Sequence, residues 1–312
     1  MKSRTIDPCL EKKQVHTALL LAAGTGSRLS PLTDITPKCL VTVNEISILE
    51  RLVFALRLQN FKRLVIVVGH QGDCIRNFLG TRAGGMEITY ITSPLYRTTN
   101  NIYSLWLARK AIDEPFLLIE SDLVFDPEML KKMLYPDRIA VSRLLPWMNG
   151  TTVTINSRQK IEAFHDDTHK HEDNHYKTVN IYSLSSSTWQ LVREKLDHYI
   201  SNNMVNGYYE TVFADMVTEG CLAFTPVFFD SNRWYEIDTI ADMRAAAQMC
   251  GRHHNLPAIT ADPDHAVSSH LVQGYPQVYR RLKGINRSKM GSRRYPDRKV
   301  SVPIISASHL LQ

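Results

Sequence analysis

Short apolar runs and helical apolar patterns alternate along the first half of the 312-residue chain. The runs are uninterrupted and rich in leucine, isoleucine and valine, which is typical of strands buried on both faces of a parallel sheet. They occupy 18–22, 64–68, 88–91 and 116–120.

Apolar residues three and four positions apart predict helices between these strands. One helix carries Leu49, Leu52 and Leu56 on one face, and we place its N-cap at Asn44. Another is predicted at 102–111. Strands that alternate with helices predict an open α/β sheet, in which ligands bind at the carboxyl ends of the strands.

The second half of the chain has a different pattern, with a larger share of predicted strands. Strands are predicted at 139–142, 151–155, 178–183 and 222–229, and helices at 187–201, 209–218 and 239–250. The stretch 164–175 is rich in histidine and acidic residues, but its spacing fits no standard metal site. We therefore interpret it as a solvated loop.

Composition narrows the class of protein. The hydrophobic fraction of 44% is ordinary for a globular protein, and no apolar run reaches membrane-spanning length. The N-terminus lacks the apolar stretch of a signal peptide, so we expect a cytoplasmic protein without a membrane span. The five cysteines lack C-x-x-C spacing and are expected to be separate thiols.

The net charge of +6 is concentrated at the C-terminal end. Residues 251–312 contain ten Lys and Arg against three Asp, hence +7, which leaves about −1 for the other 250 residues. The basic character therefore belongs to this tail, and we expect no nucleic-acid partner for the main domain. We expect 251–312 to be a poorly ordered basic extension and 1–14 a flexible leader. The oligomeric state does not follow from the sequence.

The first apolar run ends in a turn of small residues that is suited to bind an anion. Glycine and alanine let backbone N–H groups approach a phosphate closely, while Arg28 and Lys38 supply positive charge. We therefore predict that this loop binds a nucleoside triphosphate. The residues concerned are Leu21, Ala22, Ala23, Gly24, Thr25, Gly26, Ser27 and Arg28.

Other phosphate-binding motifs do not fit this loop. The chain contains no G-x-x-x-x-G-K-[ST], and the third glycine of the dinucleotide fingerprint is absent. The pattern A-A-G-x-G-S-R-L-x-P-L-T, followed by P-K-x-L, instead resembles the signature of nucleotidyltransferases. These enzymes join a nucleoside triphosphate to a phosphorylated substrate and release pyrophosphate. A structural turn flanked by surface cations is the alternative.

Two acidic residues are predicted at the same edge of the sheet as this loop. Asp122 follows the strand 116–120, and Asp238 precedes the last predicted helix. Carboxylates in such places can hold Mg²⁺ against phosphate oxygens. Taken singly, Asp122 could be a loop acid and Asp238 a helix N-cap. Beside the phosphate loop, the pair favours a metal site.

Three further segments make the resemblance more specific. They are TNNIYSL at 99–105, ESD at 120–122 and WYEID at 234–238. With the loop, they resemble the bacterial phosphocholine cytidylyltransferases and their phosphonate cytidylyltransferase relatives, over roughly residues 16–250. The resemblance implies one nucleotidyltransferase domain over 15–250. Its α/β fold would be Rossmann-like and GT-A-like, with a mostly parallel central sheet flanked by helices and a small β-rich portion for the acceptor.

The resemblance also implies roles for individual residues. The loop would hold the phosphates of CTP, Lys38 would contact the reacting phosphates, and Asp122 and Asp238 would bind Mg²⁺. It places Asn101 and Ser104 near the nucleotide base, although helix capping by these two side chains is nearly as good an explanation.

The resemblance places Trp147, Glu210 and Glu236 at positions that surround choline in that family. Aromatic faces and carboxylates suit a cation, whereas ordinary packing of these side chains is the alternative. Their character favours a small aminoalkyl phosphate or phosphonate as acceptor, of the phosphocholine or 2-aminoethylphosphonate type. The two types stay open at this point, because the sequence offers both aromatic rings and a pair of carboxylates.

The implied reaction needs positioned charge more than a general base. The acceptor oxyanion is already ionised near neutral pH, attacks the α-phosphorus of CTP and displaces pyrophosphate. Arg28, Lys38 and Asp122, together with Mg²⁺, are the expected catalytic groups. A sugar-1-phosphate nucleotidyltransferase and a non-catalytic nucleotide-binding sensor are the alternatives. Such a sensor usually loses the lysine or a metal-binding acid, and this chain keeps them.

Overall fold

Residues 14–166 and 174–250 are described by the computed structural model, and all of them fall within one unit of the chain, Met1–Val267. Nearly all of the predicted leader and the whole predicted tail lie outside the described residues, so both stay predictions. The helices are α1 (Ile48–Leu58), α2 (Gly72–Leu79), α3 (Asn101–Ala108), α4 (Ser186–Ser201), α5 (Tyr209–Thr218) and α6 (Ile240–Cys250), with 3-10 turns η2 (Ser27–Leu29), η3 (Lys38–Leu40) and η4 (Pro127–Met133).

The strands confirm most of the predicted runs. They are β1 (Thr17–Ala22), β2 (Thr42–Val43), β3 (Ile46–Ser47), β4 (Arg63–Val68), β5 (Arg82–Ala83), β6 (Met86–Thr92), β7 (Phe116–Glu120), β8 (Leu123–Phe125), β9 (Arg138–Arg143), β10 (Thr152–Ile155), β11 (Ile161–His165), β12 (His175–Leu184), β13 (Thr225–Phe229) and β14 (Trp234–Glu236). The predicted loop 164–175 needs correction, because its two ends belong to β11 and β12. Its middle, 167–173, lies outside the described residues.

Ten strands form one mixed sheet with four parallel strands, β7, β1, β4 and β6, at its centre. The prediction of a mostly parallel central sheet is confirmed for this part. Antiparallel β12 pairs with β7 and extends the sheet toward β10 and β11, while β9 and β13 branch from β12. The β-rich second half therefore continues the same sheet.

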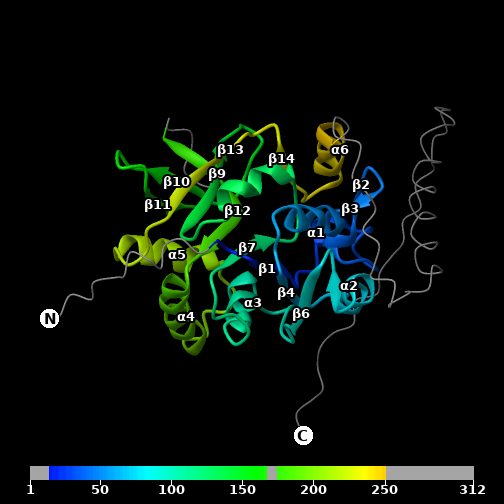
Figure 1. Ribbon diagram of the computed structural model, residues 1–312, viewed down its shortest axis with the longest axis horizontal. Helices are drawn as coiled ribbons and strands as arrows, with labels where there is room; N and C mark the ends of the chain where they lie inside the picture. Colours follow the sequence, from blue (N-terminus) through cyan, green and yellow to red (C-terminus); the bar gives the residue numbers. More distant parts are fainter. Residues whose placement is uncertain (1–13, 167–173, 251–312) are drawn as a thin grey trace, which may run out of the picture. The chain divides into compact units, whose positions relative to one another are not determined.

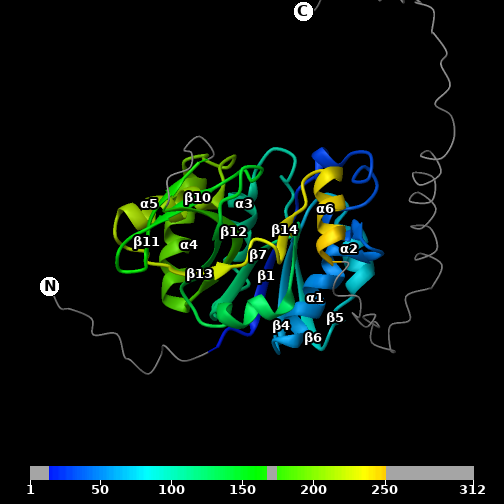
Figure 2. The same ribbon diagram turned by 90° about the horizontal axis from the view of Figure 1, so that it is seen from above.

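Alternating side chains of the central strands pack against two groups of helices. In β1, Leu19 and Leu21 contribute to a core with α3, α4 and α5, whereas Leu20 and Ala22 join a core with α1 and α2. Figures 1 and 2 show α1, α2 and α6 together, apart from α3, α4 and α5. Both faces of the central strands are covered, which explains their uninterrupted apolar runs.

The first helix begins three residues after the position that the sequence predicts. Ser47 caps α1: its hydroxyl accepts a hydrogen bond from the Glu50 amide (3.1 Å), and the Glu50 carboxylate accepts one from the Ser47 amide (2.8 Å). This reciprocal capping box satisfies two free N–H groups of the helix. Asn44, the predicted cap, lies in the β2–β3 turn with a φ of 51°. The Asn44 prediction was therefore wrong.

The order of the strands creates a crevice next to β1. The chain passes from β1 to β4 and β6 on one side and then crosses to β7 on the other side of β1. The loops that leave β1 and β7 therefore diverge at their carboxyl ends, where open α/β sheets bind ligands. Leu21 and Glu120 pair across the last positions of the two strands. The Gly-rich loop and Asp122 begin within a few residues of this pair.

The C-terminal part of the described chain returns to the same edge. Strand β14 pairs with β8, and the Ile237 amide donates a hydrogen bond to the carbonyl oxygen of Asp122 (2.9 Å). Helix α6 then packs on a small core that includes Leu29 and Val41. The sequence analysis did not predict β8 or β14, and this pairing is what carries Asp238 to Asp122.

Two simpler predictions concern the described residues as a whole. Among them, no helix combines the length and the apolar character needed to cross a membrane. The four cysteines in the described ranges are free thiols, as predicted: Cys39, Cys74, Cys221 and Cys250. Cys9 lies outside these ranges.

Candidate active site

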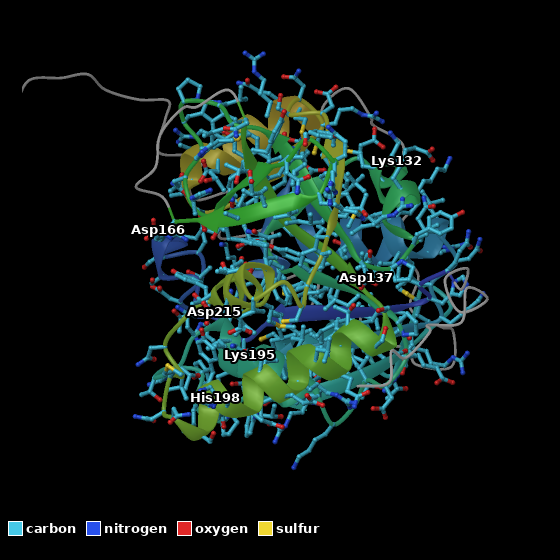
Figure 3. The ribbon with its side chains drawn as sticks, turned by 90° about the vertical axis from the view of Figure 1, so that its left-hand side faces the viewer. Lys132, Asp137, Asp166, Lys195, His198 and Asp215 are labelled. Carbon is cyan, nitrogen blue, oxygen red and sulfur yellow. The ribbon has the colours of Figure 1, made fainter. Side chains whose placement is uncertain are left out.

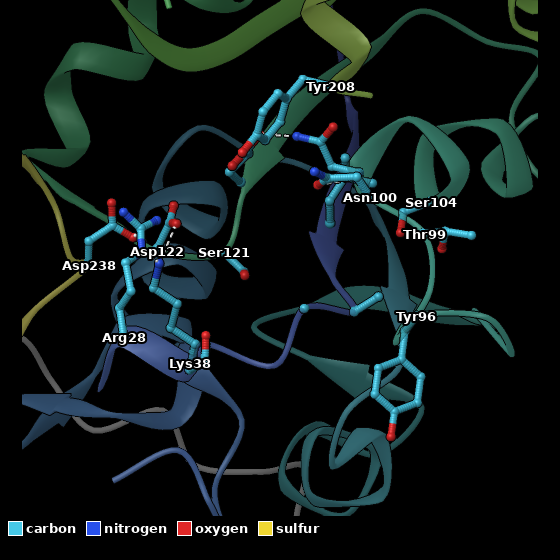
Figure 4. A pocket seen from close by; sticks show the side chains of 17 residues that line it. Arg28, Lys38, Tyr96, Thr99, Asn100, Ser104, Ser121, Asp122, Tyr208 and Asp238 are labelled. Atoms are coloured by element: carbon cyan, nitrogen blue, oxygen red, sulfur yellow. Dashed lines mark hydrogen bonds and ion pairs between the residues drawn. The ribbon is translucent and has the colours of Figure 1, made fainter. Parts of the chain in front are cut away.

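A cavity of about 270 Å³ opens at the carboxyl ends of β1 and β7 (Figure 4). It collects most of the residues predicted to bind the nucleotide and the metal. Its lining consists of Leu21, Ala23, Gly24, Gly26, Ser27, Arg28, Lys38, Tyr96, Thr99, Asn100, Asn101, Ser104, Glu120, Ser121, Asp122, Tyr208 and Asp238. Two predicted loop residues, Ala22 and Thr25, do not line it; Ala22 is buried in the core and Thr25 is exposed to solvent.

The two glycines of the loop serve different purposes. Gly26 has a φ of +63°, and a Cβ there would lie 3.1 Å from the side chains of Lys38 and Thr33. The backbone conformation and tight packing therefore require glycine at this position. A Cβ on Gly24 would meet no protein atom within 4 Å. Gly24 lines the cavity, so the absence of a side chain leaves room beside its backbone.

Lys38 is the centre of an ion-pair cluster at one side of the cavity (Figure 4). Its Nζ lies 2.7 Å from Asp122 Oδ2 and 2.7 Å from Asp238 Oδ1. Burial by itself would lower the pKa of Lys38, but the charges and hydrogen bonds of the two aspartates raise it above its ordinary value. The ammonium is therefore fixed and charged at neutral pH.

Arg28 joins the same cluster from the loop. Its Nη2 lies 2.7 Å from Asp238 Oδ1, and 64% of its side chain is exposed, against 14% for Lys38. Arg28 thus supplies a more exposed charge to the lining of the cavity. Asp122 Oδ1 is buried and has no hydrogen-bond partner among the described residues. An unsatisfied buried carboxylate oxygen is costly unless something binds it.

Asn101 connects two parts of the site. Its Nδ2 donates to Glu120 Oε1 (3.0 Å), and its Oδ1 accepts from the Tyr209 amide (3.0 Å). Both ends of the amide thus have protein partners, and Asn100, not Asn101, caps α3. Asn101 ties β7 to the start of α5. Its contact with the nucleotide base, like that of Ser104, stays a prediction.

A second cluster of carboxylates includes Glu120, which also lines the cavity. It consists of Glu120, Glu210 and Glu236, together with Lys177 from β12. The Lys177 Nζ lies 3.5 Å from Glu236 Oε2 and donates to the Thr178 carbonyl oxygen (2.9 Å). Lys177 is only 2% exposed and Glu210 only 7%. We call these four residues the glutamate cluster.

Burial and mutual repulsion shift the pKa values of the glutamate cluster. Burial, followed by the charges of Glu210 and Asp122, raises the pKa of Glu120 well above its usual value. Burial raises the pKa of Glu210 to about 7, although the Lys177 charge opposes this shift. The pKa of Glu236 is also raised by burial, again against the effect of Lys177. Lys177 is the one cation of the cluster, so it can neutralise only one of the three carboxylates.

The structure relates the three predicted acceptor residues only in part. Glu210 and Glu236 belong to the glutamate cluster, whereas Trp147 stacks on Tyr235 with ring centroids 4.8 Å apart and planes at 7°. The Trp147 side chain is 51% exposed and does not line the cavity. The predictions missed Lys177 and Glu120. Lys177 directly precedes the predicted strand 178–183, and nothing in the neighbouring sequence indicates that its side chain is buried.

Comparisons with known proteins agree with this geometry. Residues 18–150 match the model of the MobA-like NTP transferase domain. The chain is 31% identical over 240 residues to the CMP-5'-(3-aminopropyl)phosphonate synthase of Streptomyces rubellomurinus, covering 73% of this chain but only 38% of that protein. It is 25% identical to the choline-phosphate cytidylyltransferase of Streptococcus pneumoniae, covering 73% of this chain and 95% of the relative.

A solved structure extends the comparison to the fold. The CTP:phosphocholine cytidylyltransferase of Streptococcus pneumoniae superposes with a TM-score of 0.64 at 23% identity, over 76% of this chain and 99% of that one. The sheet order, the loop signature and the match over 18–150 lead to one conclusion. Residues 18–150 are a MobA-like NTP transferase domain of the nucleotidyltransferase type, and the chain is similar to choline-phosphate and phosphonate cytidylyltransferases.

Proposed function

We propose that the protein transfers CMP from CTP to a small aminoalkyl phosphate or phosphonate and releases pyrophosphate. One observation carries the proposal: a cavity with two paired cations and two aspartates adjoins a buried cluster of three glutamates that contains one lysine. The first group suits a triphosphate, and the second suits a positively charged substrate. The names of the relatives support CTP as the donor.

The residues of the cavity fit a magnesium ion. Asp122 Oδ1 is buried without a partner, and Asp238 lies in the same ion-pair cluster. Within 14–166 and 174–250, no group of three or more His, Cys, Asp or Glu side chains could hold a metal by itself. Two carboxylates suit Mg²⁺, which usually completes its coordination with water and substrate phosphates. When bound, it would neutralise phosphate charge in the transition state.

Lys38 and Arg28 act on the triphosphate in this proposal. An oxyanion of the acceptor attacks the α-phosphorus of CTP, the bond to the β-phosphate oxygen breaks, and pyrophosphate carries away the electron pair. Negative charge is crowded throughout, so fixed positive groups lower the barrier. Lys38 is held in place by two aspartates, whereas exposed Arg28 can follow the leaving pyrophosphate.

In this proposal, the glutamate cluster binds the non-reacting end of the acceptor. Glu120 is common to both regions: it lines the cavity, and Glu210 and Glu236 raise its pKa. An acceptor that spans them would place its phosphorus at the cavity and its cationic end among the glutamates. Remote binding of this kind aligns the nucleophile with the α-phosphorus.

Pyrophosphate release across four nucleoside triphosphates and a panel of acceptors tests the proposal. We expect turnover with CTP and with aminoalkyl phosphates or phosphonates, and little with hexose phosphates. Activity confined to UTP, GTP or dTTP with hexose 1-phosphates would replace the proposal by a sugar-phosphate nucleotidyltransferase. Tight nucleotide binding without turnover on any acceptor would support the sensor alternative.

A further inference from the structure

We infer that His70 is a positioning residue for the nucleotide, which holds the loop after β1 in the conformation that keeps its backbone open to the cavity. The inference rests on the proposed function for the identity of the nucleotide. His70 stands in the turn between β4 and α2 and does not line the cavity. Its hydrogen bonds reach both ends of the loop, residues 23–33.

Loop 23–33 has few anchors of its own. Of the described residues 24–32, only Leu29 is buried, and Thr33 then closes the loop with 2% of its surface exposed. Backbone N–H groups bind an anion only when the loop conformation directs them toward it. Contacts from neighbouring segments therefore decide how well this loop is fixed.

His70 supplies such contacts at both ends of loop 23–33. Its amide donates to the Ala23 carbonyl oxygen (3.1 Å), at the start of the loop. Its imidazole Nε2 lies 2.9 Å from the Thr33 carbonyl oxygen, at the end of the loop. Because a carbonyl oxygen can only accept, Nε2 carries the proton and donates it. One residue thus connects the two ends of the loop.

Thr33 passes this support on to the middle of the loop. Its Oγ1 donates to the Gly26 carbonyl oxygen (2.8 Å), which also accepts from the Leu29 amide (2.9 Å). A Cβ on Gly26 would lie 3.1 Å from Thr33 Cγ2 and 3.1 Å from Lys38 Cβ. A displacement of Thr33 would therefore disturb Gly26 and the packing of Lys38.

The same turn also contacts another part of the cavity lining. A Cβ on Gly69 would lie 2.6 Å from the Ala23 carbonyl oxygen and 2.7 Å from Tyr96 Cβ, so the backbone of the turn needs glycine to approach both. Tyr96 lines the cavity (Figure 4), and its ring centroid lies 6.2 Å from that of His70. The turn therefore supports the lining at Ala23 and at Tyr96 from outside the cavity.

Nucleotide binding without acceptor tests the inference. His70→Leu removes the donor to the Thr33 carbonyl oxygen, whereas the side-chain amide of His70→Gln can donate from a position near that of Nε2. We expect the Kd for CTP with Mg²⁺, measured by isothermal titration calorimetry, to rise about tenfold in His70→Leu and less than about threefold in His70→Gln. His198→Leu, at an exposed histidine on α4 that Figure 3 labels, is the matched control and should bind as the wild type does.

Steady-state kinetics distinguish positioning of the nucleotide from a general structural role. In His70→Leu the KM for CTP should rise with the Kd, while the KM for the acceptor should stay within about twofold of the wild-type value. If His70→Leu fails to fold, Thr33→Val removes the next hydrogen bond, to Gly26, and keeps the shape of the side chain. We expect Thr33→Val to raise the Kd for CTP about fivefold and Thr33→Ser to restore it.

The outcomes separate the inference from the proposed function. A wild-type Kd in His70→Leu, or in Thr33→Val where His70→Leu does not fold, would overturn the inference and leave the proposed function intact. Equal losses in His70→Leu and His70→Gln would also overturn it, because the N–H donor would then not be what matters. If the wild type binds a different nucleoside triphosphate in place of CTP, the proposed function fails, and the same variants test His70 with that nucleotide. No binding of any nucleoside triphosphate would overturn both.

Discussion

Two carboxylate clusters lie side by side in this protein, and they differ in how their charge is balanced. At the cavity, Asp122 lies 2.7 Å from Lys38, and Asp238 lies 2.7 Å from both Lys38 and Arg28. The glutamate cluster has three carboxyl groups and one lysine, Lys177, whose Nζ lies 3.5 Å from Glu236 Oε2. The carboxylates of the first cluster are paired with cations, whereas the second cluster has more carboxyl groups than cations, and burial raises the pKa values of its glutamates.

We propose that this difference lets one fold bind opposite charges a short distance apart. In the proposed function, the aspartates of the first cluster would bind Mg²⁺, and Lys38 and Arg28 would then pair with phosphate oxygens. The unbalanced cluster keeps raised carboxyl pKa values until a cation enters. A substrate with a negative and a positive end would bind in one orientation only. The predictions below test this division of roles.

The largest effect is expected at Lys38. Lys38→Ala should lower kcat by about 100-fold or more, because the fixed charge next to the reacting phosphates is lost, and the fold should be retained. Steady-state pyrophosphate release measures the rate, and circular dichroism checks the fold. Lys110→Ala removes an exposed lysine after α3 and is the control. A rate within a few-fold of the wild type would remove Lys38 from the site.

Substitution of Asp122 or Asp238 should lower kcat by a factor similar to that of Lys38→Ala or slightly smaller. Asp122→Asn is expected to lower kcat by about 100-fold, and Asp238→Asn to do so while raising the Mg²⁺ concentration needed for half-maximal rate. Titrations of Mg²⁺ at saturating CTP measure kcat and the Mg²⁺ concentration for half-maximal rate in each variant. Unchanged metal dependence in the two variants would contradict their assignment as metal ligands.

The strand pattern and the loop signature predicted most of this cluster from the sequence. Continuous apolar runs identify β1, β4 and β7 because these strands are buried on both faces, and the small residues after β1 indicate the phosphate loop. The meeting of Asp122 with Asp238 depends on the pairing of β8 with β14, two three-residue strands without a local pattern. The sequence analysis placed both acids at the carboxyl edge of the sheet, from their positions after a strand and before a helix, but it did not predict the two short strands that join them.

The glutamate cluster was predicted less completely for a physical reason. Glu210 and Glu236 were named from the resemblance, but Lys177 and Glu120 were not among the predicted site residues. Lys177 stands in β12, where burial depends on β9 and β10 packing beside it. The charge balance of a buried cluster depends on several segments that are far apart in the sequence, so it cannot be predicted from any one of them.

The phosphate loop offers a test in which folding and binding are separable. Gly24→Ala adds a methyl group toward open space in the cavity, so we expect an unchanged melting temperature and a KM for CTP raised by about tenfold. Gly26→Ala should instead lower the melting temperature, because Gly26 has a φ of +63°. Equal behaviour of the two variants would contradict the roles given to these glycines.

The stability of the ligand-free protein should fall as the pH rises from 5 to 8. Burial raises the pKa of Glu210 in the folded protein to about 7 from its ordinary value of 4.5, so folding favours its protonated form. This contribution is present at low pH and is lost as the pH passes the folded pKa, by an amount on the order of 2 kcal/mol. Denaturant unfolding at several pH values measures it, and Glu210→Gln should flatten the slope.

The smallest effect is expected at Trp147. Because its ring stacks on Tyr235 and lies outside the cavity lining, Trp147→Ala should raise the acceptor KM by only about threefold. An aromatic cage around the cation would give a larger change, roughly 30-fold for a desolvated cation–π contact. The KM for CTP is the internal reference. A rise of the larger size would show that Trp147 holds the cationic end directly.

One comparison tests the division of roles most directly. The acceptors are 2-aminoethylphosphonate and propylphosphonate, which differ by an ammonium in place of a methyl group, and the proteins are the wild type, Lys38→Ala and Glu210→Gln. We expect the wild type to prefer the amine by about tenfold or more in kcat/KM, Glu210→Gln to lose most of this preference, and Lys38→Ala to slow both acceptors by the same factor. The account is contradicted if Glu210→Gln slows both acceptors equally, or if Lys38→Ala changes the preference.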